Sequence, residues 1–483
     1  MSSVLGRGVF AMSLASAVGL ATTIAAYFIY SRVLTPAQFG LYAGALTLAK
    51  FGTILLDGGL KTALIKHPVE VDARVQRALF LGSSAAALAI LALVCGGLLA
   101  LHALGQVDGA TAAFLGLYGA AYFTTYPLVI VPLAELERTQ RYAPVAWSES
   151  VAIVLEYGLP ALLWTTVAPG FWSFVVCAWL ARALRSAVVL AAARQRPWLR
   201  RATAADWGGM RALFLEGLGL QLAVSVCLLR DSLHLVLVGP WFGREWVGLY
   251  AWALQLCAAA SQVFALTAAR VALPALRLTE GSAVRWQAAL TQVAWLTLLT
   301  APPLVFLTPA AAVVNETLFG GKWSAALALV PLLVARMLPG LATTPLGALL
   351  LAERGARSYA LANAAWTAAE VIAAVVLLAW VGPRGLAWSY SFMAWFGVLM
   401  LVGRLPGPAA MGALLAPLLL RPSLWLALAL LGLYLASDVP AQIHANLAAA
   451  AAWVAGGSLL CLASEARFRG WLHAFWQQHL RSA

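Results

Sequence analysis

Ionisable side chains lie inside the long apolar runs of this chain, where charge is costly. The stretch Gly217–Gly239 is almost wholly apolar and long enough to cross a bilayer as one helix, yet Arg230, Asp231 and His234 stand near its middle. Charged residues at such depth usually face a bundle interior or a water-filled cavity, and they often mark a substrate or ion pathway. These residues therefore predict a polar site inside a membrane protein.

Further charged residues recur at similar depth in other apolar runs. We interpret seven of the deep charges as the lining of a central substrate-binding cavity: Lys50, Glu156, Arg182, Arg230, Asp231, Arg336 and Glu370. The alternative for each is a structural ion pair between helices, and Arg182 could instead extend its head group toward the inner surface. No residue is interpreted as catalytic. The cysteines are scattered without a C-x-x-C pair, so we expect no metal site.

The spacing of these charges gives two hints about their placement. Lys50 and Asp57 are seven residues apart, so they share one helix face. Glu156 and Glu370 are 214 residues apart, close to the period of an internal repeat described below. The two glutamates are therefore either related by that repeat or matched by chance, and the sequence leaves both readings open.

Composition sets the class of protein. Of 483 residues, 63% are hydrophobic and 10% charged, and the mean hydropathy is +0.87. A soluble protein could not bury so much apolar surface, so we predict an all-α, polytopic membrane protein. The net charge of +13 does not predict nucleic-acid binding, because the basic residues sit in short loops between apolar runs.

Fourteen membrane-spanning helices are predicted from the apolar runs. Their ranges are 8–31, 39–60, 78–101, 110–133, 145–167, 170–193, 212–238, 245–272, 287–308, 323–351, 359–381, 384–403, 423–437 and 440–463. With these ranges, 21 of the 31 Lys and Arg residues fall on the side of the N-terminus and 4 on the other side. The positive-inside rule therefore places both termini in the cytoplasm.

An internal repeat divides the chain. Gly40–Leu46 reads nearly the same as Gly248–Leu254, at an offset of 208 residues. Six spans per repeat return the chain to the same side of the membrane, which indicates two parallel six-helix lobes. We predict lobes at 1–210 and 211–403, and two peripheral helices with a cytoplasmic tail at 404–483.

A sequence motif near the N-terminus carries a resemblance to a known family. Residues 32–42 read R-x-L-x-P-x-x-F-G-x-Y, and residues 55–64 read LLDGGLKTAL. These segments resemble the opening of the polysaccharide-transporter (Wzx-type) flippases of the multidrug/oligosaccharidyl-lipid/polysaccharide export superfamily. The likeness covers the whole chain in span number and repeat, whereas the C-terminal third resembles the family only in hydropathy.

The resemblance implies two lobes around a cavity that opens alternately to each side of the bacterial cytoplasmic membrane. It implies an undecaprenyl-pyrophosphate-linked oligosaccharide as cargo, moved from the inner to the outer leaflet for surface polysaccharide such as O-antigen or exopolysaccharide. Partners would be this lipid-linked oligosaccharide, membrane lipids and a polysaccharide polymerase, and no cofactor is implied. Arginine suits such a cargo because its planar fork binds phosphate through two hydrogen bonds.

Other classes fit less well. An ATP-driven pump needs a G-x-x-x-x-G-K-[ST] motif, which is absent from the sequence. A membrane enzyme needs acidic or histidine catalysts in large outer loops, whereas the outer loops here are short and their acids isolated. The nearest alternative is a cation-coupled multidrug antiporter of the same superfamily, which favours an acidic cavity. The deep charges are slightly cationic in total, which favours an anionic cargo.

Overall fold

The computed structural model describes residues 2–66, 71–167, 170–193, 206–278 and 280–405, together with Gly456 and Ser458. These residues form helices and their connections, with no strand among them, so the predicted all-α class is confirmed. The chain divides into two compact units, Met1–Val236 and Leu237–Ala483, and each unit is described below by itself.

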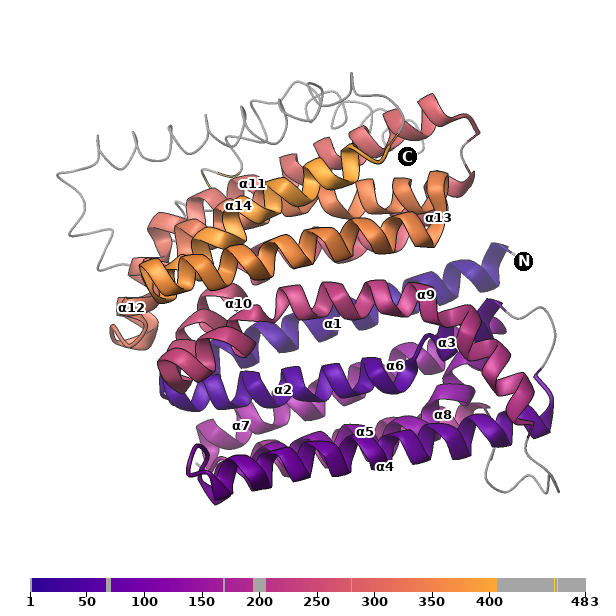
Figure 1. Ribbon diagram of the computed structural model, residues 1–483, viewed down its shortest axis with the longest axis horizontal. Coiled ribbons are helices and arrows are strands. Elements are labelled where there is room, and N and C mark those ends of the chain that lie inside the picture. The colour runs from indigo at the N-terminus through magenta and orange to yellow at the C-terminus, as the bar shows by residue number, and fades with distance from the viewer. Residues whose placement is uncertain are drawn as a thin grey trace, which may run out of the picture. The chain divides into compact units, whose positions relative to one another are not determined.

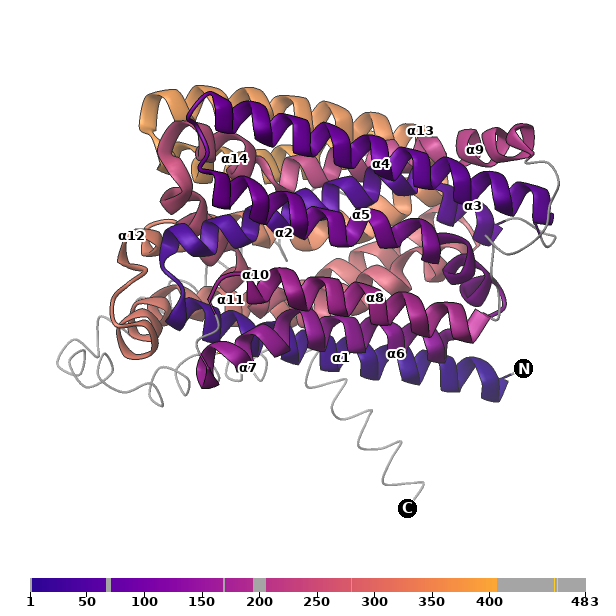
Figure 2. The same ribbon diagram turned by 90° about the horizontal axis from the view of Figure 1, so that it is seen from below.

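The first unit contains six long helical passes and two further helices. The passes are α1 (Ser2–Val33), α2 (Pro36–Asp57), α4 (Ala73–Ala103), α5 (Gly109–Arg138), the continuous run of α6 (Tyr142–Ile153), η1 (Val154–Gly158) and α7 (Leu159–Thr166), and α8 (Ser173–Ala193). The short α3 (Leu60–Lys66) follows α2, and α9 (Trp207–Asp231) follows α8. Helix α5 is central, because it packs against α2, α4 and α8 (Figures 1 and 2).

The second unit begins within the π-helix η2 (His234–Val238). Its helices are α10 (Gly239–Leu278), α11 (Ser282–Phe319), α12 (Ser324–Leu327), α13 (Val330–Val381) and α14 (Pro383–Val402). Helices α10 and α13 are each broken by one glycine, Gly243 and Gly355, and Gly382 alone separates α13 from α14. All three glycines have φ near +80° with an extended ψ, a backbone conformation open essentially only to glycine.

The helices have the length and surface of membrane spans. Eight helices in the described part of the chain are long and apolar enough to cross a bilayer. On α4, Leu88, Leu93 and Leu99 are 64–77% exposed, which is unfavourable in water but not in lipid. Each half of α13 exceeds the roughly 20 residues that a crossing needs. The helical segments coincide with the first twelve predicted spans, whereas the predicted spans 423–437 and 440–463 lie outside the described residues, apart from Gly456 and Ser458.

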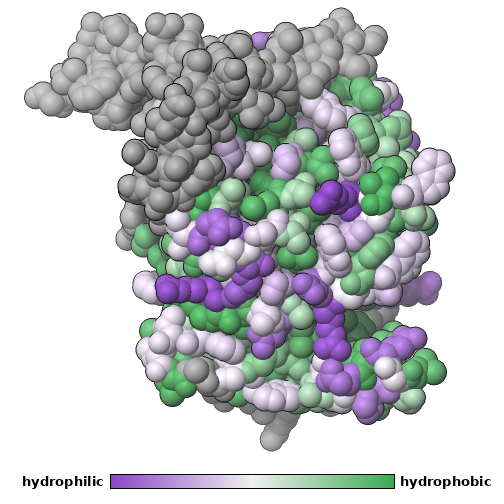
Figure 3. All heavy atoms as spheres, turned by 90° about the vertical axis from the view of Figure 1, so that its left-hand side faces the viewer, coloured by the Kyte–Doolittle hydropathy of each residue, from purple (hydrophilic) through white to green (hydrophobic). Residues whose placement is uncertain are grey.

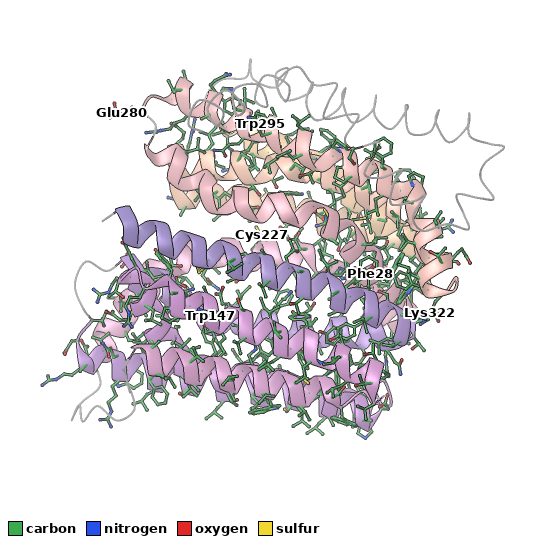
Figure 4. All side chains as sticks on the ribbon, turned by 180° about the vertical axis from the view of Figure 1, so that it is seen from behind. Phe28, Trp147, Cys227, Glu280, Trp295 and Lys322 are labelled. Carbon is green, nitrogen blue, oxygen red and sulfur yellow. The ribbon has the colours of Figure 1, made fainter. Side chains whose placement is uncertain are left out.

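Polar residues gather where the helices end. Figure 3 shows the end at which α4 turns into α5, where hydrophilic side chains are interspersed with apolar ones. In the second unit, Glu280 and Lys322 lie at opposite ends of α11 (Figure 4). Along the helices the side chains are mainly apolar; on α6, for example, Trp147 is 66% exposed. This distribution is typical of a membrane protein with short loops.

The motif at residues 32–42 builds the start of α2. Thr35 is the N-cap: its hydroxyl accepts the Gln38 backbone N–H at 3.3 Å, while the Gln38 side chain accepts the Thr35 backbone N–H at 3.0 Å. This reciprocal pair is a capping box, and Pro36 stands at the first helical position, where its missing N–H costs nothing. The motif therefore fixes a helix start, and Phe39 and Tyr42 follow it into the core.

The two repeated segments occupy matching places. Gly40–Leu46 lies in the first turns of α2, and Gly248–Leu254 lies just after the Gly243 break in α10. Tyr42 and Tyr250, at equivalent positions of the repeat, are 4% and 0% exposed. Each repeated segment therefore begins the second long helix of its half of the chain and buries the same tyrosine.

Helix α9 packs within the first unit, although the repeat counts it as the opening helix of the second half. It contacts α2, α3 and α4. Its Gly217 backbone lies directly on the backbone of Gly59, so a Cβ on Gly217 would come within 2.3 Å of the Gly59 carbonyl oxygen. The Gln221 side-chain amide also donates to the Ile54 carbonyl at 2.5 Å. The compact units therefore divide at 236/237, and the predicted lobe boundary at 210/211 remains a sequence-based prediction.

Candidate functional site

A buried carboxylate forms the centre of a polar cluster in the first unit. Glu156 is 1% exposed and lies on η1, about midway along its pass. It accepts hydrogen bonds from the Tyr118 hydroxyl at 2.8 Å, from the Tyr122 hydroxyl and from Nη2 of Arg182. Three helices, α5, η1 and α8, therefore meet at one charged group, and the arginine neutralises it.

The arginine of this cluster makes a second contact, with an aromatic ring. The Cζ atom of Arg182 lies 4.1 Å from the centroid of the Tyr122 ring, within range of a cation–π interaction. The π-helical turn that carries Glu156 has its own support from α1, because the Tyr30 hydroxyl donates to the carbonyl of Tyr157. Single π-helical turns inside α-helices occur frequently at functional sites.

A stripe of tyrosines along α5 extends the polar contacts. Tyr118, Tyr122 and Tyr126 are spaced four residues apart, so they lie on one face of the helix. The Tyr126 hydroxyl donates to Oδ1 of Asp57 at 2.5 Å, and Oδ2 of Asp57 accepts the Gly59 backbone N–H at 3.1 Å. The stripe is not among the predicted site residues, although the four-residue spacing of tyrosines in an apolar run is a signal in the sequence that could have revealed it.

Two further ion pairs lie near the stripe. Lys61 Nζ is 2.7 Å from Oε1 of Glu137, and Arg185 Nη2 is 3.9 Å from Oε1 of Glu149. Both pairs are partly exposed, so each contributes little to stability. Among the residues the structure describes, no group of three or more His, Cys, Asp or Glu side chains is arranged to hold a metal ion.

The second unit has a related arrangement. The Cζ atom of Arg336, in the first half of α13, lies 4.1 Å from the centroid of the Tyr390 ring on α14. Glu370, in the second half of α13, is 1% exposed. When α9 is counted as the opening helix of the second half of the repeat, each half of the chain has a buried glutamate in its fifth pass and an arginine–tyrosine pair between its fourth and sixth passes.

The prediction of one continuous helix over Gly217–Gly239 is wrong. Helix α9 ends at Asp231, Ser232 caps it, and the π-helix η2 begins at His234. Arg230 lies in the last turn of α9, with Nε 3.5 Å from Oδ1 of Asp231. Adjacent residues within a helix point well apart, yet at this helix end the two side chains come within 3.5 Å of each other. Arg230 is 8% exposed, whereas the Asp231 side chain is 54% exposed.

Lys50 is exposed, as is Asp231, whereas the other predicted site residues are buried or partly buried. It lies on α2, beside the buried Ala49, seven residues before the helix ends at Asp57. A cation that faced lipid within a span would cost about 3 kcal/mol of free energy. The exposure of Lys50 therefore favours a position in a water-filled space. The structure thus brings Glu156 and Arg182 together, and Arg230 and Asp231 together, and it leaves Lys50 exposed.

Comparisons with known proteins agree with this fold. The family model described as "Polysaccharide biosynthesis protein" matches residues 29–328. The solved structure of a lipid II flippase, MurJ, in an inward closed conformation has a TM-score of 0.71 at 12% identity, covering 98% of this chain and 99% of that one.

Two multidrug transporter structures are also similar. An inward-facing MATE family transporter of the MOP superfamily has a TM-score of 0.57 at 14% identity, covering 80% of this chain and 94% of that one. A variant of the Vibrio cholerae MATE transporter VcmN has a TM-score of 0.52 at 15% identity, covering 83% and 98%. No curated protein sequence matches the chain. Its fold is shared with a lipid II flippase and with multidrug transporters. Because the family model matches well over half of the residues, the chain belongs to the polysaccharide biosynthesis protein family.

Proposed function

We propose that this protein is a flippase that moves an undecaprenyl-pyrophosphate-linked oligosaccharide from the inner to the outer leaflet of the bacterial cytoplasmic membrane, for surface polysaccharide synthesis. The observation that carries the proposal is the family match over residues 29–328, which names polysaccharide biosynthesis. The fold shared with a lipid II flippase supports the same class of cargo. Transport would proceed by alternating access.

The chemistry of the cargo suggests roles for three charged residues within the spans. The pyrophosphate and sugars need water and positive charge, whereas the polyprenyl tail can remain in lipid. We propose that Lys50 and Arg230 attract the pyrophosphate, because each is a cation within a span. The exposed carboxylate of Asp231 keeps Arg230 oriented and limits how tightly the phosphate is held, which favours release.

The orientation and partners complete the proposal. Both termini are cytoplasmic, because the basic residues concentrate on that side. The lipid-linked cargo would be loaded there and delivered to a polysaccharide polymerase at the outer surface. A cation-coupled multidrug antiporter is the second candidate, supported by the MATE structures at TM-scores of 0.52–0.57, below that of the flippase.

Deleting the gene in its own bacterium tests the proposal. We expect surface polysaccharide to disappear and undecaprenyl-pyrophosphate-linked oligosaccharide to accumulate at the inner leaflet, as measured by extraction and mass spectrometry. Re-expression of the chain should reverse both effects. If the deletion instead leaves polysaccharide intact and increases sensitivity to cationic dyes, the protein is a drug exporter and the proposal is wrong.

A further inference from the structure

Both halves of the repeat, with α9 counted as the first pass of the second half, place a guanidinium over a tyrosine ring between their fourth and sixth passes. In the first unit, Arg182 of α8 lies over Tyr122 of α5. In the second unit, Arg336 of α13 lies over Tyr390 of α14. The Cζ-to-centroid distance is 4.1 Å in both. The same contact thus occurs twice, but the helix that supplies the arginine differs.

The internal repeat explains this difference as an exchange of residue types. Tyr122 and Arg336 are 214 residues apart, the same offset as between the two glutamates. Arg182 and Tyr390 are 208 residues apart, the offset of the repeated segments. Most of this change of offset falls in one connection, since six residues, 167–172, join the fifth and sixth passes of the first half and Gly382 alone does so in the second. The fourth and sixth passes have therefore exchanged tyrosine and arginine.

We propose that these two clusters are one helix-positioning device, present twice with its arginine and tyrosine exchanged. In the first half, Arg182 packs on the Tyr122 ring and neutralises the buried Glu156. We assign the same task in the second half to Arg336, which packs on the Tyr390 ring, with Glu370 as the buried glutamate. Arg182 and Arg336 are then positioning residues that fix three helices together, and they do not bind the phosphates of the cargo. The inference rests on the proposed function only for the identity of that cargo.

The contacts of the first cluster support this role. The Glu156 side chain is 0% exposed, and its oxygens already accept from Arg182 and from the hydroxyls of Tyr118 and Tyr122. If Arg182 turned away to bind a phosphate, it would leave a fully buried carboxylate without a counter-charge. Breaking one side of a buried ion pair is strongly destabilising, so this motion is unfavourable.

The second cluster is simpler than the first. At the offset of 214 residues, the counterpart of Tyr118 is Leu332, whose carbonyl accepts the Ser391 hydroxyl at 2.6 Å. The first cluster therefore has one more tyrosine hydroxyl, and its glutamate, Glu156, accepts from two tyrosines and one arginine. For this reason the experiment is best carried out in the first unit.

An exchange experiment tests the device directly. We compare Tyr122→Arg, Arg182→Tyr and the double variant, purified in detergent, by thermal unfolding and by the amount of protein in the membrane. The first single variant brings two guanidiniums together and the second leaves Glu156 without a counter-charge. Each should lower the unfolding temperature by several degrees. The double variant restores the charges in the arrangement of the second unit, so it should recover most of the loss.

A second pair of variants does not depend on fitting an arginine into α5. Arg182→Gln should lower the unfolding temperature, and adding Glu156→Gln should recover it, because the charge that needed the arginine is gone. Arg185→Gln is the matched control on the same helix. Its partner Glu149 is 3.9 Å away and 35% exposed, so the fall should be smaller, and Glu156→Gln should not reverse it.

The outcomes separate positioning from cargo binding. Double variants that remain as unstable as the single variants would overturn the inference. So would an Arg182→Gln protein with normal amount and unfolding temperature that fails to move undecaprenyl-pyrophosphate-linked oligosaccharide in proteoliposomes. If the wild-type protein moves none of this lipid while the unfolding temperatures follow the expected pattern, the proposed function fails and the positioning device stands.

Discussion

At the scale of single residues, Arg230 is the in-span cation with the clearest test. It lies at the end of α9, and its neighbour Asp231 is half exposed. Loss of the guanidinium therefore leaves a carboxylate that water can solvate, which costs little stability. We expect Arg230→Ala to leave the amount of protein in the membrane unchanged but to abolish glycan export, measured as surface polysaccharide.

Conservative replacement sharpens this test. Lysine supplies a point charge without the planar fork, so Arg230→Lys should restore only part of the export. Normal protein levels with normal export in Arg230→Ala would contradict the assigned role. A collapse of protein level would instead show that Arg230 is a structural residue.

Lys50 should affect cargo binding more than folding. Its side chain is exposed, so truncation leaves no cavity and breaks no buried contact. A hydrogen bond to a charged group contributes about 1.5–3 kcal/mol, so Lys50→Ala should raise the cargo concentration for half-maximal transport roughly tenfold or more. Transport in proteoliposomes over a range of lipid-linked oligosaccharide concentrations measures this shift, and Lys50→Arg is the control that keeps the charge. An unchanged half-maximal concentration in Lys50→Ala would remove Lys50 from the cargo site.

The sequence identified the charged residues of the site but not their contacts. Glu156 and Arg182 both stood out as charges in apolar runs, yet their pairing depends on how η1 and α8 pack, and no local pattern encodes that packing. The pairing of Arg230 with Asp231 does not follow from an uninterrupted helix, in which adjacent side chains point well apart. Helix α9 ends at Asp231, just before Ser232, and side chains at a helix end have more freedom to turn toward each other.

At the scale of elements, the contact of α9 with the end of α2 depends on two glycines. A Cβ on Gly217 would lie 2.3 Å from the Gly59 carbonyl oxygen, far inside contact distance. Gly217→Ala must therefore push α9 away from α2 and α3, and we expect a clear fall in unfolding temperature. The matched control is Gly44→Ala, because a Cβ there meets nothing within 4 Å.

The control should behave oppositely for a known reason. Alanine has a higher helix propensity than glycine by about 1 kcal/mol, so Gly44→Ala should leave the unfolding temperature unchanged or raise it. Equal behaviour of the two variants would show that α9 does not depend on close contact at Gly217. The measurement is thermal unfolding of the purified protein in one detergent.

At the scale of the whole molecule, the direction of insertion is the main untested prediction. The loop around Gln106 should face outward and the loop around Arg141 inward, and both residues are exposed. In intact cells, a membrane-impermeant maleimide should label Gln106→Cys but not Arg141→Cys, in a background without the native cysteines. Permeabilised cells provide the control, in which both should react. The reverse pattern would invert the topology.

Hydropathy predicted the order of the helices well but missed the interruption at Ser232. The first twelve predicted ranges coincide with helical segments, because bilayer thickness sets the length of an apolar run. The break of α13 at Gly355 lies between the predicted ranges 323–351 and 359–381, whereas the interruption at Ser232 falls inside the predicted range 212–238. The packing of α9 on the first unit was also missed, because the repeat groups helices by sequence and not by contact.

The unequal connections between the fifth and sixth passes have a practical consequence. Six residues, 167–172, make a link in the first unit that Gly382 makes alone in the second, so helix packing does not fix the length of this link. Added length in a surface loop costs little free energy. An epitope or small fluorescent domain inserted at this link should be tolerated, whereas the same insertion at Gly355 or Gly382 would separate helices held by one residue. The link is therefore a suitable place for a reporter on the predicted outer face, where a tagged protein could be followed in living cells.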